Sequence, residues 1–488
     1  MSAESLDNVH EFTRASMCFD TPGTKVDVLE QQHQHFEDIF NVSSDYLREI
    51  TDNFVSVLRQ GLEKENQVVP MLPTFVFGWP NGKEEGQFLS LDMGGTNIRV
   101  CLVELKGNRK FDLTQVKFRI TDEQKHEDGQ ELFDFCAQCI KDFITKHFGS
   151  CDNVPHSLSL GFTFSYPTTQ RAIDHGELIR WTKGFSNANT EGHDCAEMLR
   201  QSLKKLQVPV ELSSIINDTT GTLIASNYVD PSTKIAVILG TGCNAAYMEQ
   251  ISEVPKIASL NLSGDEKMAI NCEYGAFDSF EHKHLARVRN RYDEHIDLTS
   301  NKPHEQAFEK MIAGLYLGEI FRLIVCDLIY QNGLFLGQET YKLEKPYSFD
   351  TAFLSLIETD PTDELLTVMG LFKFFFSIET ELEERQFFRR LAQLIGTRSA
   401  RLSACGIAAI VKKTNLLAEG GCTVGVDGSL YSKYPHFADR LHDALVEILG
   451  PEGNSIQIRQ AEDGSGAGSA VIAAMTKARK DAGIYSHV

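Results

Sequence analysis

The pattern of apolar and polar positions predicts strands and helices in alternation along the chain. Two segments, residues 87–105 (QFLSLDMGGTNIRVCLVEL) and residues 234–250 (KIAVILGTGCNAAYMEQ), each consist of an apolar run, a glycine-rich turn and a second apolar run. Such a pattern predicts two strands joined by a tight turn. Because this strand–turn–strand signal occurs twice, the sequence favours two related α/β domains.

Further stretches predict the elements around these strands. Helical spacing occurs at residues 28–64 and 130–147, and residues 304–333 predict one long helix. Residues 68–86 (VVPMLPTFVFGWPNGKEEG) are punctuated by proline and glycine, which is typical of a linker. The aromatic cluster FKFFF, residues 372–376, is interpreted as part of the core.

Length and charge limit the classes of protein that this chain can belong to. The chain has 488 residues, of which 42% are apolar, and this length favours two domains. Its net charge is −21, so the surface repels nucleic-acid backbones and anionic membranes. The most apolar long segment, residues 311–329, carries charged side chains and is interpreted as a buried helix. The acidic N-terminus lacks the apolar stretch of a signal peptide. We therefore expect a cytoplasmic protein with no membrane anchor and no nucleic-acid partner.

Cysteine usage points to a reducing environment. The chain has 11 cysteines, an odd number, and their scatter predicts reduced thiols rather than a disulfide framework. One pair, Cys136 and Cys139, has C-x-x-C spacing, but no second pair follows, and the segment resembles the middle of an amphipathic helix. We therefore expect no metal or redox role for this pair.

Glycine-rich turns at the ends of predicted strands carry the first chemical signal, because their backbone N–H groups can approach an anion closely. The turns are DMGGT at residues 92–96, LGTGCN at 239–244 and EDGSGAG at 462–468, with VDGS at 426–429. Each turn alone is typical of a plain hairpin, but together they indicate a nucleotide whose phosphates contact both domains. The sequence lacks a Walker A loop, the protein-kinase HRD and DFG motifs, and a dinucleotide-binding glycine motif with its distal acid.

Polar residues at strand ends carry the second signal. The set comprises Ser165, Thr182, Lys183, Asn217, Asp218, Asn244 and Glu273. Most are uncharged hydrogen-bonding groups or carboxylates, which suits a neutral polyhydroxylated ligand such as a sugar. In its local context, IINDTTGTL, Asp218 is typical of a helix cap. Phosphate turns combined with a hydroxyl-binding set indicate a sugar kinase.

Nine motifs, in one order along the chain, carry a resemblance to a known family. They are LDMGGTNIRV, LGFTFSYP, RWTKGF, INDTTGTL, LGTGCNAAY, NCEYGAFD, FEKMIAGLYLGE, VDGSLY and AEDGSGAG. Through them the chain resembles the hexokinases, in particular fungal hexokinases and glucokinases, of the sugar kinase–actin–Hsp70 superfamily. The resemblance implies an α/β fold of two related actin-like (ribonuclease H-like) domains, one small and one large, that flank a deep cleft.

The corresponding domain division places each domain in two pieces of the chain. Residues 1–25 are expected to form a mobile N-terminal tail. The large domain is expected to comprise residues 26–82 and 218–463, and the small domain residues 83–217 and 464–488.

The resemblance implies that Mg²⁺-ATP binds at the glycine turns. Asp92 would organise Mg²⁺, through water, and Arg99 would support the nucleotide side. The implied ATP-binding set is Asp92, Gly94, Gly95, Thr96, Asn97, Thr241, Gly242, Gly428, Ser429, Gly464, Ser465 and Gly466. The last five of these residues are expected on the adenosine side.

The resemblance also implies a hexose site with a catalytic base. Asp218 would accept the proton of the sugar 6-hydroxyl, and Lys183 would help to neutralise the transferred phosphoryl group. The implied substrate-binding set is Ser165, Thr182, Lys183, Asn217, Asp218, Asn244, Glu273 and Glu309. The expected activity is transfer of the ATP γ-phosphoryl group to glucose and related hexoses, which gives hexose 6-phosphate, the first step of glycolysis.

Several alternatives remain beside this interpretation. A glucokinase restricted to glucose is the near alternative to a hexokinase of broad specificity. A weakly catalytic, sugar-sensing regulatory protein on the same fold and an actin- or chaperone-like ATPase are more distant. The presence of Asp218, Asp92 and Gly242 favours catalysis, and the strings FTFSYP and RWTKGF argue against the ATPase. The chain is expected to be a monomer or a homodimer.

Overall fold

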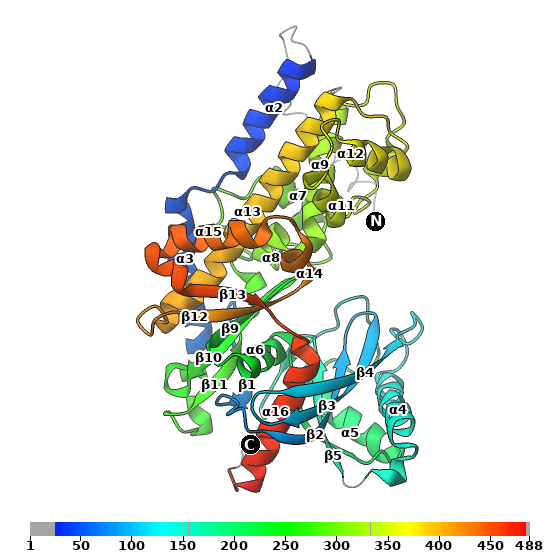
Figure 1. Cartoon of the computed structure of the whole chain (residues 1–488), viewed down its shortest axis with the longest axis vertical. Helices are drawn as coiled ribbons and strands as arrows, with labels where there is room; N and C mark the ends of the chain where they lie inside the picture. The colour runs from blue at the N-terminus through cyan, green and yellow to red at the C-terminus, as the bar shows by residue number, and fades with distance from the viewer. Residues whose placement is uncertain (1–24, 155–156, 332, 485–488) are drawn as a thin grey trace.

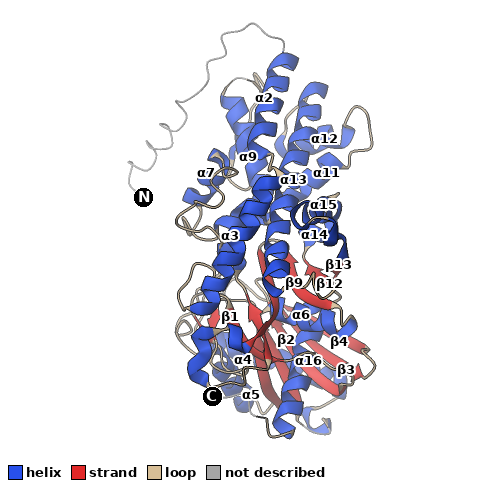
Figure 2. Cartoon of the chain, turned by 90° about the vertical axis from the view of Figure 1, so that its left-hand side faces the viewer, coloured by secondary structure: helices blue, strands red, loops and turns tan. Residues whose placement is uncertain are grey.

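The structure of the chain is a computed structural model that describes residues 25–154, 157–331 and 333–484. Of the expected N-terminal tail, residues 1–25, only Lys25 falls within this part, where it begins the helix α2. The strands lie together in the lower half of the molecule in Figure 2, and a large group of helices lies above them.

One half of the molecule is built on a five-stranded sheet in the order β4-β3-β2-β5-β8. Strands β2, β3 and β4 pair antiparallel, whereas β5 pairs parallel with both β2 and β8. The bounds are β2 (Glu85–Met93), β3 (Asn97–Lys106), β4 (Phe111–Arg119), β5 (Leu158–Phe164) and β8 (Val210–Ile216), with the short strands β6 (Thr168–Thr169) and β7 (Glu177–Leu178) beside them. Helices α4 (Gly129–Phe148) and α5 (Cys195–Lys205) help to form a hydrophobic core that belongs to this half.

The other half is built on a six-stranded sheet in the order β1-β11-β10-β9-β12-β13. The bounds are β1 (Leu72–Phe77), β9 (Thr233–Leu239), β10 (Cys243–Gln250), β11 (Lys267–Asn271), β12 (Cys422–Asp427) and β13 (Ile456–Gln460). Each sheet contains a strand–glycine turn–strand unit, β2–β3 in one and β9–β10 in the other. The duplication predicted from the sequence is therefore confirmed, and the fold is α/β with two sheets.

Helices cover the six-stranded sheet and extend beyond it (Figure 1). They are α2 (Lys25–Phe40), α3 (Ser44–Glu63), α6 (Asp218–Val229), α7 (Arg291–Thr299), α8 (Ala307–Ile312), α9 (Gly314–Tyr330), α10 (Tyr341–Glu344), α11 (Thr351–Glu358), α12 (Leu366–Leu371), α13 (Leu382–Thr414), α14 (Ser429–Lys433) and α15 (Phe437–Leu449). The last helix, α16 (Gly464–Asp481), returns to the five-stranded sheet. Short helical turns are η2 (Cys151–Asn153), η3 (Ile251–Glu253), η4 (Pro255–Leu260), η5 (Tyr274–Ala276), η6 (Phe372–Phe376) and η7 (Pro451–Ser455).

The long helix α13 is the centre of the helical part. By length and composition it could cross a membrane, but 83% of its most apolar window is buried inside the molecule. It contacts α2, α3, α9, α11 and α15, so its apolar side chains are used in packing. This burial is that of a core helix.

The segment interpreted as a linker, residues 68–86, instead contains an edge strand. Strand β1 pairs antiparallel with β11, and its register shifts between Pro73 and Phe77. A proline lacks an N–H donor and is tolerated where one side of the strand has no partner. The prolines of this segment therefore indicate a strand at the edge of a sheet rather than a linker between domains.

The prediction of one long helix over residues 304–333 is also wrong, because the helix is interrupted between α8 and α9. Ala313 has an extended backbone, with ψ of 151°, and Gly314 begins the next helix. The Gly314 N–H donates to the Gly240 carbonyl at 2.8 Å. Packing against the glycine turn of β9–β10 thus decides where α9 begins. This contact joins residues far apart in the sequence, so the local sequence pattern does not predict it.

The prediction that the FKFFF cluster is core holds for only half of its aromatic rings. Phe372 and Phe376 are buried, whereas Phe374 is 80% exposed and Phe375 is 48% exposed. The five residues form one helical turn, so their side chains point in all directions around its axis. Only one face of that turn can meet the core.

The predicted free thiols agree with the structure. Every described cysteine is free, and most are buried. Cys136 and Cys139 lie in the middle of α4, as expected, and burial raises the pKa of both thiols. A raised pKa disfavours the reactive thiolate, so this pair is suited to packing.

Helices α6 and α16 cross each other at very close range and connect the two halves. Helix α6 leaves β8 of the five-stranded sheet but packs on β9 of the other sheet, whereas α16 leaves β13 and packs on β5 and β2. A Cβ atom at Gly468 of α16 would lie 2.0 Å from the Gly221 carbonyl oxygen of α6. The two backbones can approach this closely only because these positions carry no side chain.

We expect that Gly468→Ala will lower the free energy of unfolding by about 1–3 kcal/mol, because the added methyl group forces the two helices apart. The measurement is the midpoint of urea unfolding. Gly370→Ala is the matched control, because nothing lies within 4 Å of a Cβ at this position in α12. That control should be neutral or stabilising. Equal midpoints for Gly468→Ala and the unchanged chain would contradict the close crossing.

Candidate active site

The first glycine turn, residues 94–96, joins β2 to β3 and places Asp92 beside Arg99. The antiparallel register of the two strands sets these two residues directly opposite each other. Arg99 donates to Asp92 Oδ2 at 3.0 Å and to Asp463 Oδ1 at 2.5 Å. Burial raises the pKa of Asp92, and the Arg99 guanidinium acts in the opposite direction. The arginine thereby ties the turn to the segment that precedes α16.

The start of α16 completes this network on the predicted nucleotide side. Ser465 Oγ donates to Asp92 Oδ2 at 2.8 Å and accepts from Arg99 at 2.6 Å. Thr163, at the end of β5, donates to the Ser465 carbonyl at 3.1 Å. Residues 464–466 form the first turn of the helix, where backbone N–H groups have no acceptor within the helix. A helix N-terminus that is held in this way suits an anion.

The second glycine turn, residues 240–242, joins β9 to β10. The Gly240 N–H donates to the Gly242 carbonyl at 3.0 Å, and the start of α9 packs on the same turn through Gly314. Gly428 lies against it with φ of 122°, and a Cβ there would lie 2.7 Å from the Gly240 nitrogen. The structure thereby brings together the predicted nucleotide residues Thr241, Gly242, Gly428 and Ser429.

Two predicted nucleotide residues make little contact with this arrangement. Thr96 and Asn97 are exposed, and the Asn97 side chain donates to Thr96 Oγ1 at 2.9 Å. Asp463 accepts from Arg99 in the network on the predicted nucleotide side, but the sequence analysis did not include it in the ATP-binding set. It lies within the motif AEDGSGAG, so the motif itself contained the signal.

Asn217 and Asp218 lie at the start of α6, directly after β8. Asn217 is the N-cap residue, and its Oδ1 accepts the Thr219 N–H at 2.8 Å. Asp218 is the first helical residue, and its Oδ1 accepts the same N–H at 2.7 Å. In the described part of the chain, Asp218 Oδ2 has no hydrogen-bond donor. The helix cap that local sequence assigned to Asp218 is therefore supplied chiefly by Asn217, and one Asp218 oxygen remains available.

Asn244 and Glu273 form a buried network with Asn271. Asn244 Nδ2 donates to Asn271 Oδ1 at 2.8 Å and to Glu273 Oε1 at 3.0 Å, and Asn271 Nδ2 also donates to Glu273 Oε1 at 2.9 Å. Glu273 has a left-handed backbone with φ of 53°, and its N–H donates to Asn244 Oδ1. Burial raises the pKa of Glu273. Sequence reasoning missed Asn271, because the residue gains its role only when β10 and β11 pair.

Lys183 joins the predicted sugar side to the first glycine turn. Its Nζ donates to the Ser165 carbonyl at 2.8 Å and lies 5.1 Å from the centre of the Tyr166 ring. A Cβ at Gly95 would lie 3.3 Å from the Lys183 Cβ. The Thr182 carbonyl accepts a backbone N–H in the same turn. The lysine thus lies where a group bound at the first glycine turn and a group bound near Ser165 would meet.

Electrostatic interactions place the Asp218 carboxylate among the other acids of the site. Burial is the largest cause of the raised pKa values of Asp92, Glu273 and Asp427, and the charge of Asp218 adds to each. Lys183 acts in the opposite direction on Glu273. Asp218 therefore interacts both with the nucleotide-side acid Asp92 and with the sugar-side acid Glu273. Asp427 is a further acid that the sequence analysis did not single out.

Glu309 and Gln306 approach the site from α8. Glu309 Oε2 accepts the Cys243 N–H at 2.9 Å, and burial raises the pKa of Glu309 to about 7. Gln306 directly precedes α8, and its buried Oε1 has no hydrogen-bond partner in the described part of the chain. That oxygen lies 2.9 Å from the position of a Cβ on Gly275. A buried acceptor without a donor suits a ligand hydroxyl, so Gln306 is a candidate site residue that sequence reasoning missed.

The site defines an α/β enzyme in which glycine turns of two sheets meet a buried set of amides and carboxylates. Comparisons with known proteins agree. One family model described as hexokinase matches residues 32–228, and a second one matches residues 234–475. The chain is 49% identical to the hexokinase of Emericella nidulans in an alignment over 463 residues that covers 93% of this chain and 92% of that protein. It is 46% identical to hexokinase-1 of Schizosaccharomyces pombe over 450 residues, 92% and 91% of the two chains.

A solved structure gives the same result. The hexokinase from Schistosoma mansoni complexed with glucose superimposes with a TM-score of 0.82 at 36% identity, covering 92% of this chain and 99% of that one. The chain belongs to the hexokinase family and is an ATP-dependent hexose phosphotransferase. The predicted family, the fold class and the reaction class are therefore confirmed.

The buried carboxyl of Glu309 makes stability depend on pH. Its pKa in the folded chain, about 7, is above the ordinary value of 4.5, so the folded chain holds this proton more tightly than the unfolded one. The stability that this adds is present below the ordinary value and is lost as the pH rises through about 7. We expect Glu309→Gln, which stays neutral, to be more stable than the unchanged chain at about pH 8, by on the order of 2–3 kcal/mol.

The measurement for Glu309→Gln is urea unfolding at several pH values between about pH 5 and pH 8. The stability difference between the variant and the unchanged chain should grow as the pH rises. Glu452→Gln, at an exposed position, is the control and should give no such trend. A difference for Glu309→Gln that does not change with pH would contradict the burial argument.

Proposed function

We propose that this hexokinase transfers the ATP γ-phosphoryl group to the 6-hydroxyl of glucose and related hexoses. The observation that carries the proposal is the position of Asp218 at the start of α6. One of its carboxylate oxygens has no hydrogen-bond donor among the described residues, and its charge acts on Asp92 and Glu273, acids of the two proposed ligand sites. The relative from Schistosoma mansoni, whose structure contains glucose, supports glucose as the substrate. The product is hexose 6-phosphate, and its formation is the first step of glycolysis.

In this proposal the two ligands occupy the two sets of residues described above. ATP lies along the glycine turns, and the hexose lies in a cleft between the two halves. The proposed hexose contacts are Ser165, Thr182, Lys183, Asn217, Asp218, Asn244, Glu273, Gln306 and Glu309. The proposed ATP contacts are Asp92, Gly94, Gly95, Thr96, Asn97, Thr241, Gly242, Gly428, Ser429, Gly464, Ser465 and Gly466. The amide and carboxylate oxygens accept from sugar hydroxyls, and the amide N–H groups donate to them.

Asp218 acts as the general base. Phosphoryl transfer proceeds through a loose transition state, so positioning and charge neutralisation matter more than covalent chemistry. Asp218 Oδ2 accepts the 6-hydroxyl proton as the sugar oxygen attacks the γ-phosphorus, and the bond between that phosphorus and the bridging oxygen breaks, so that ADP leaves. Its Oδ1 is held by the Thr219 N–H, which fixes the orientation of the carboxylate. Lys183 lies between the first glycine turn and the sugar set, where its charge stabilises the transferred group.

The acids at the nucleotide side fit a magnesium ion. Asp92 and Asp427 offer carboxylate oxygens close to the glycine turns, and Mg²⁺ prefers oxygen ligands and retains several waters. Asp92 Oδ2 already accepts from Arg99 and Ser465, so we propose that Asp92 holds Mg²⁺ through water. When it is bound, Mg²⁺ neutralises phosphate charge and orients the γ-phosphoryl group.

The remaining expectations are also proposals. The division into a large domain, residues 26–82 and 218–463, and a small domain, residues 83–217 and 464–488, is supported by the two sheets and by the return of α16 to the five-stranded one. We propose a hexokinase of broad specificity, with a glucokinase restricted to glucose as the alternative. Rates on glucose, mannose and fructose distinguish the two. We further propose a cytoplasmic enzyme, in agreement with its free thiols.

We expect Asp218→Ala to lower kcat by about 100-fold or more, because this variant lacks the carboxylate that we propose as the general base. Binding of glucose should persist, since the amide network remains. The measurements are ADP release in a coupled assay and glucose binding by calorimetry. Asp363→Ala, at an exposed position, is the control and should retain full activity. Near-normal turnover with Asp218→Ala would refute the base assignment, and a lack of hexose-dependent ADP release by the unchanged chain would favour the sugar-sensing alternative.

An ion pair links the two halves directly beside the proposed sugar site. Arg180 Nη2 lies 3.0 Å from Glu305 Oε2. Arg180 precedes Trp181, which belongs to the hydrophobic core of the five-stranded half, and Glu305 precedes α8, whose Phe308 belongs to the other core. Because the pair spans two separate cores next to Lys183 and Gln306, we propose that it stabilises the form in which both halves contact the sugar.

We expect Arg180→Ala or Glu305→Ala to weaken glucose binding by about twofold to fivefold, which is the range for a partly exposed ion pair. Calorimetric titration with glucose measures the effect. The exchange Arg180→Glu with Glu305→Arg should restore part of the affinity, whereas each single reversal should weaken binding further. Equal losses in the exchange variant and in the single reversals would show that the pair itself does not act across the halves.

A further inference from the structure

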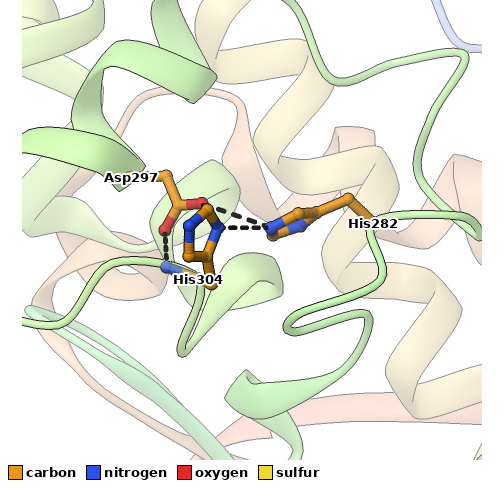
Figure 3. Close-up of side chains that lie close together, drawn as sticks. All are labelled: His282, Asp297 and His304. Carbon is orange, nitrogen blue, oxygen red and sulfur yellow. Dashed lines mark hydrogen bonds and ion pairs between the residues drawn. The ribbon is translucent and has the colours of Figure 1, made fainter.

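Two histidines and an aspartate meet outside the proposed active site, and Figure 3 shows them facing one another. His282 lies in the loop before α7, Asp297 lies in α7, and His304 lies in the loop that leads to α8. His282 Nε2 is 3.3 Å from His304 Nδ1 and 3.4 Å from Asp297 Oδ2, and His304 Nδ1 is 3.7 Å from Asp297 Oδ2. Three atoms that can bind a metal therefore converge from three different segments.

We propose that His282, Asp297 and His304 form a binding site for a divalent transition-metal ion, of which zinc fits best. Zinc binds imidazole nitrogen and carboxylate oxygen at about 2.0–2.2 Å in tetrahedral geometry, so its ligand atoms are about 3.3–3.5 Å apart. The three separations in this cluster match that range to within a few tenths of an ångström. Two imidazoles and one carboxylate leave the fourth position to water.

The protonation of the two imidazoles suits a metal. Two facing ring nitrogens at 3.3 Å need one shared proton, because two bare lone pairs repel each other. A metal ion takes the place of this proton and binds both nitrogens, and each neutral ring then carries its proton on its other nitrogen. Because a protonated ring must lose its extra proton before it can bind, binding tightens as the pH rises.

Neighbouring charges set the strength of the site. Asp297 Oδ1 accepts from Lys310 Nζ at 2.7 Å and from the His304 N–H at 2.9 Å, and these bonds orient the carboxylate. Arg289 donates to Asp297 Oδ2 at 3.0 Å, so a metal must share this oxygen with a cation. Asp278 lies behind the His282 loop and accepts three of its backbone N–H groups. Repulsion from Arg289 and Lys310 makes the site weaker than one that lacks these cations.

Metal binding at this position would fix the loop that carries part of the proposed sugar site. His304 is adjacent to Glu305 and two residues before Gln306, and its carbonyl accepts the Phe280 N–H at 2.8 Å. A metal that joins His282, Asp297 and His304 ties this loop to α7. The metal site itself rests on the cluster alone and does not depend on the proposed function.

The experiment is calorimetric titration of the untagged, full-length chain with zinc chloride in the presence of excess Mg²⁺. Excess Mg²⁺ competes for sites made only of oxygen, such as the one proposed at Asp92, so the remaining signal reports sites with nitrogen or sulfur ligands. We expect one zinc ion per chain, and weaker binding below about pH 6 because protons compete for the imidazoles.

Variants locate the bound ion. His304→Ala, at an exposed position, and His282→Ala should each weaken zinc binding by about tenfold or more, because each removes one of three protein ligands. His35→Ala removes an exposed histidine of α2 and is the matched control, with unchanged binding expected. Zinc should also raise the thermal unfolding temperature of the unchanged chain but not that of His304→Ala.

Two outcomes would overturn the proposal. One is the absence of stoichiometric zinc binding by the unchanged chain. The other is equal binding by the unchanged chain, His304→Ala and His282→Ala, which would locate the ion elsewhere, for example at a cysteine. His304→Ala keeps the test valid where His282→Ala fails to fold, because the His304 side chain is about half exposed, at 49%, and contributes little to packing.

Discussion

The close crossing of α6 and α16 is the constraint on which the site depends. Each helix leaves one sheet and packs on the other, so their contact holds the two halves in register. The N-terminus of α6 carries Asp218, and the N-terminus of α16 carries Ser465 of the Asp92 network. Since Gly221 and Gly468 allow the two backbones to meet, the distance between the proposed base and the nucleotide side is set by backbone packing rather than by flexible side chains.

A second constraint is the concentration of acids in a small, partly buried volume. Burial raises the pKa of Asp92, Glu273 and Asp427, and the charge of Asp218 adds to each of these shifts. Arg99 and Lys183 offset part of this repulsion. Such an arrangement is costly for the protein without ligands, and it becomes favourable when cations and sugar hydroxyls are bound. The buried acids thus lower the stability of the folded protein without ligands, and they keep the groups of the proposed site in place.

Much of the fold could be predicted from the sequence, because strand periodicity and glycine turns depend only on near neighbours. The strands on both sides of residues 94–96 and 240–242 lie where the pattern indicated. Two errors occurred where a distant contact overrides the local pattern. Residues 72–77 became a strand because β11 lies beside them, and the helix over 304–333 broke because α9 begins on the turn at Gly240. A third error had a local cause, because the aromatic run at 372–376 forms one helical turn and only one side of that turn meets the core.

For the candidate site, too, some features could be predicted from the sequence and others depend on distant contacts. Residue types and their motifs alone determined the family and the reaction class, and they predicted the turns, Asp218 and the amide set as candidate site residues. The tertiary structure decided which groups pair. Arg99 meets Asp463 across 364 positions, Asn271 joins Asn244 through strand pairing, and Gln306 Oε1 is buried with no donor among the described residues. The physical reason is that burial, hydrogen-bond partners and pKa shifts are properties of the assembled surroundings, whereas a sequence motif records only what lies next to it along the chain.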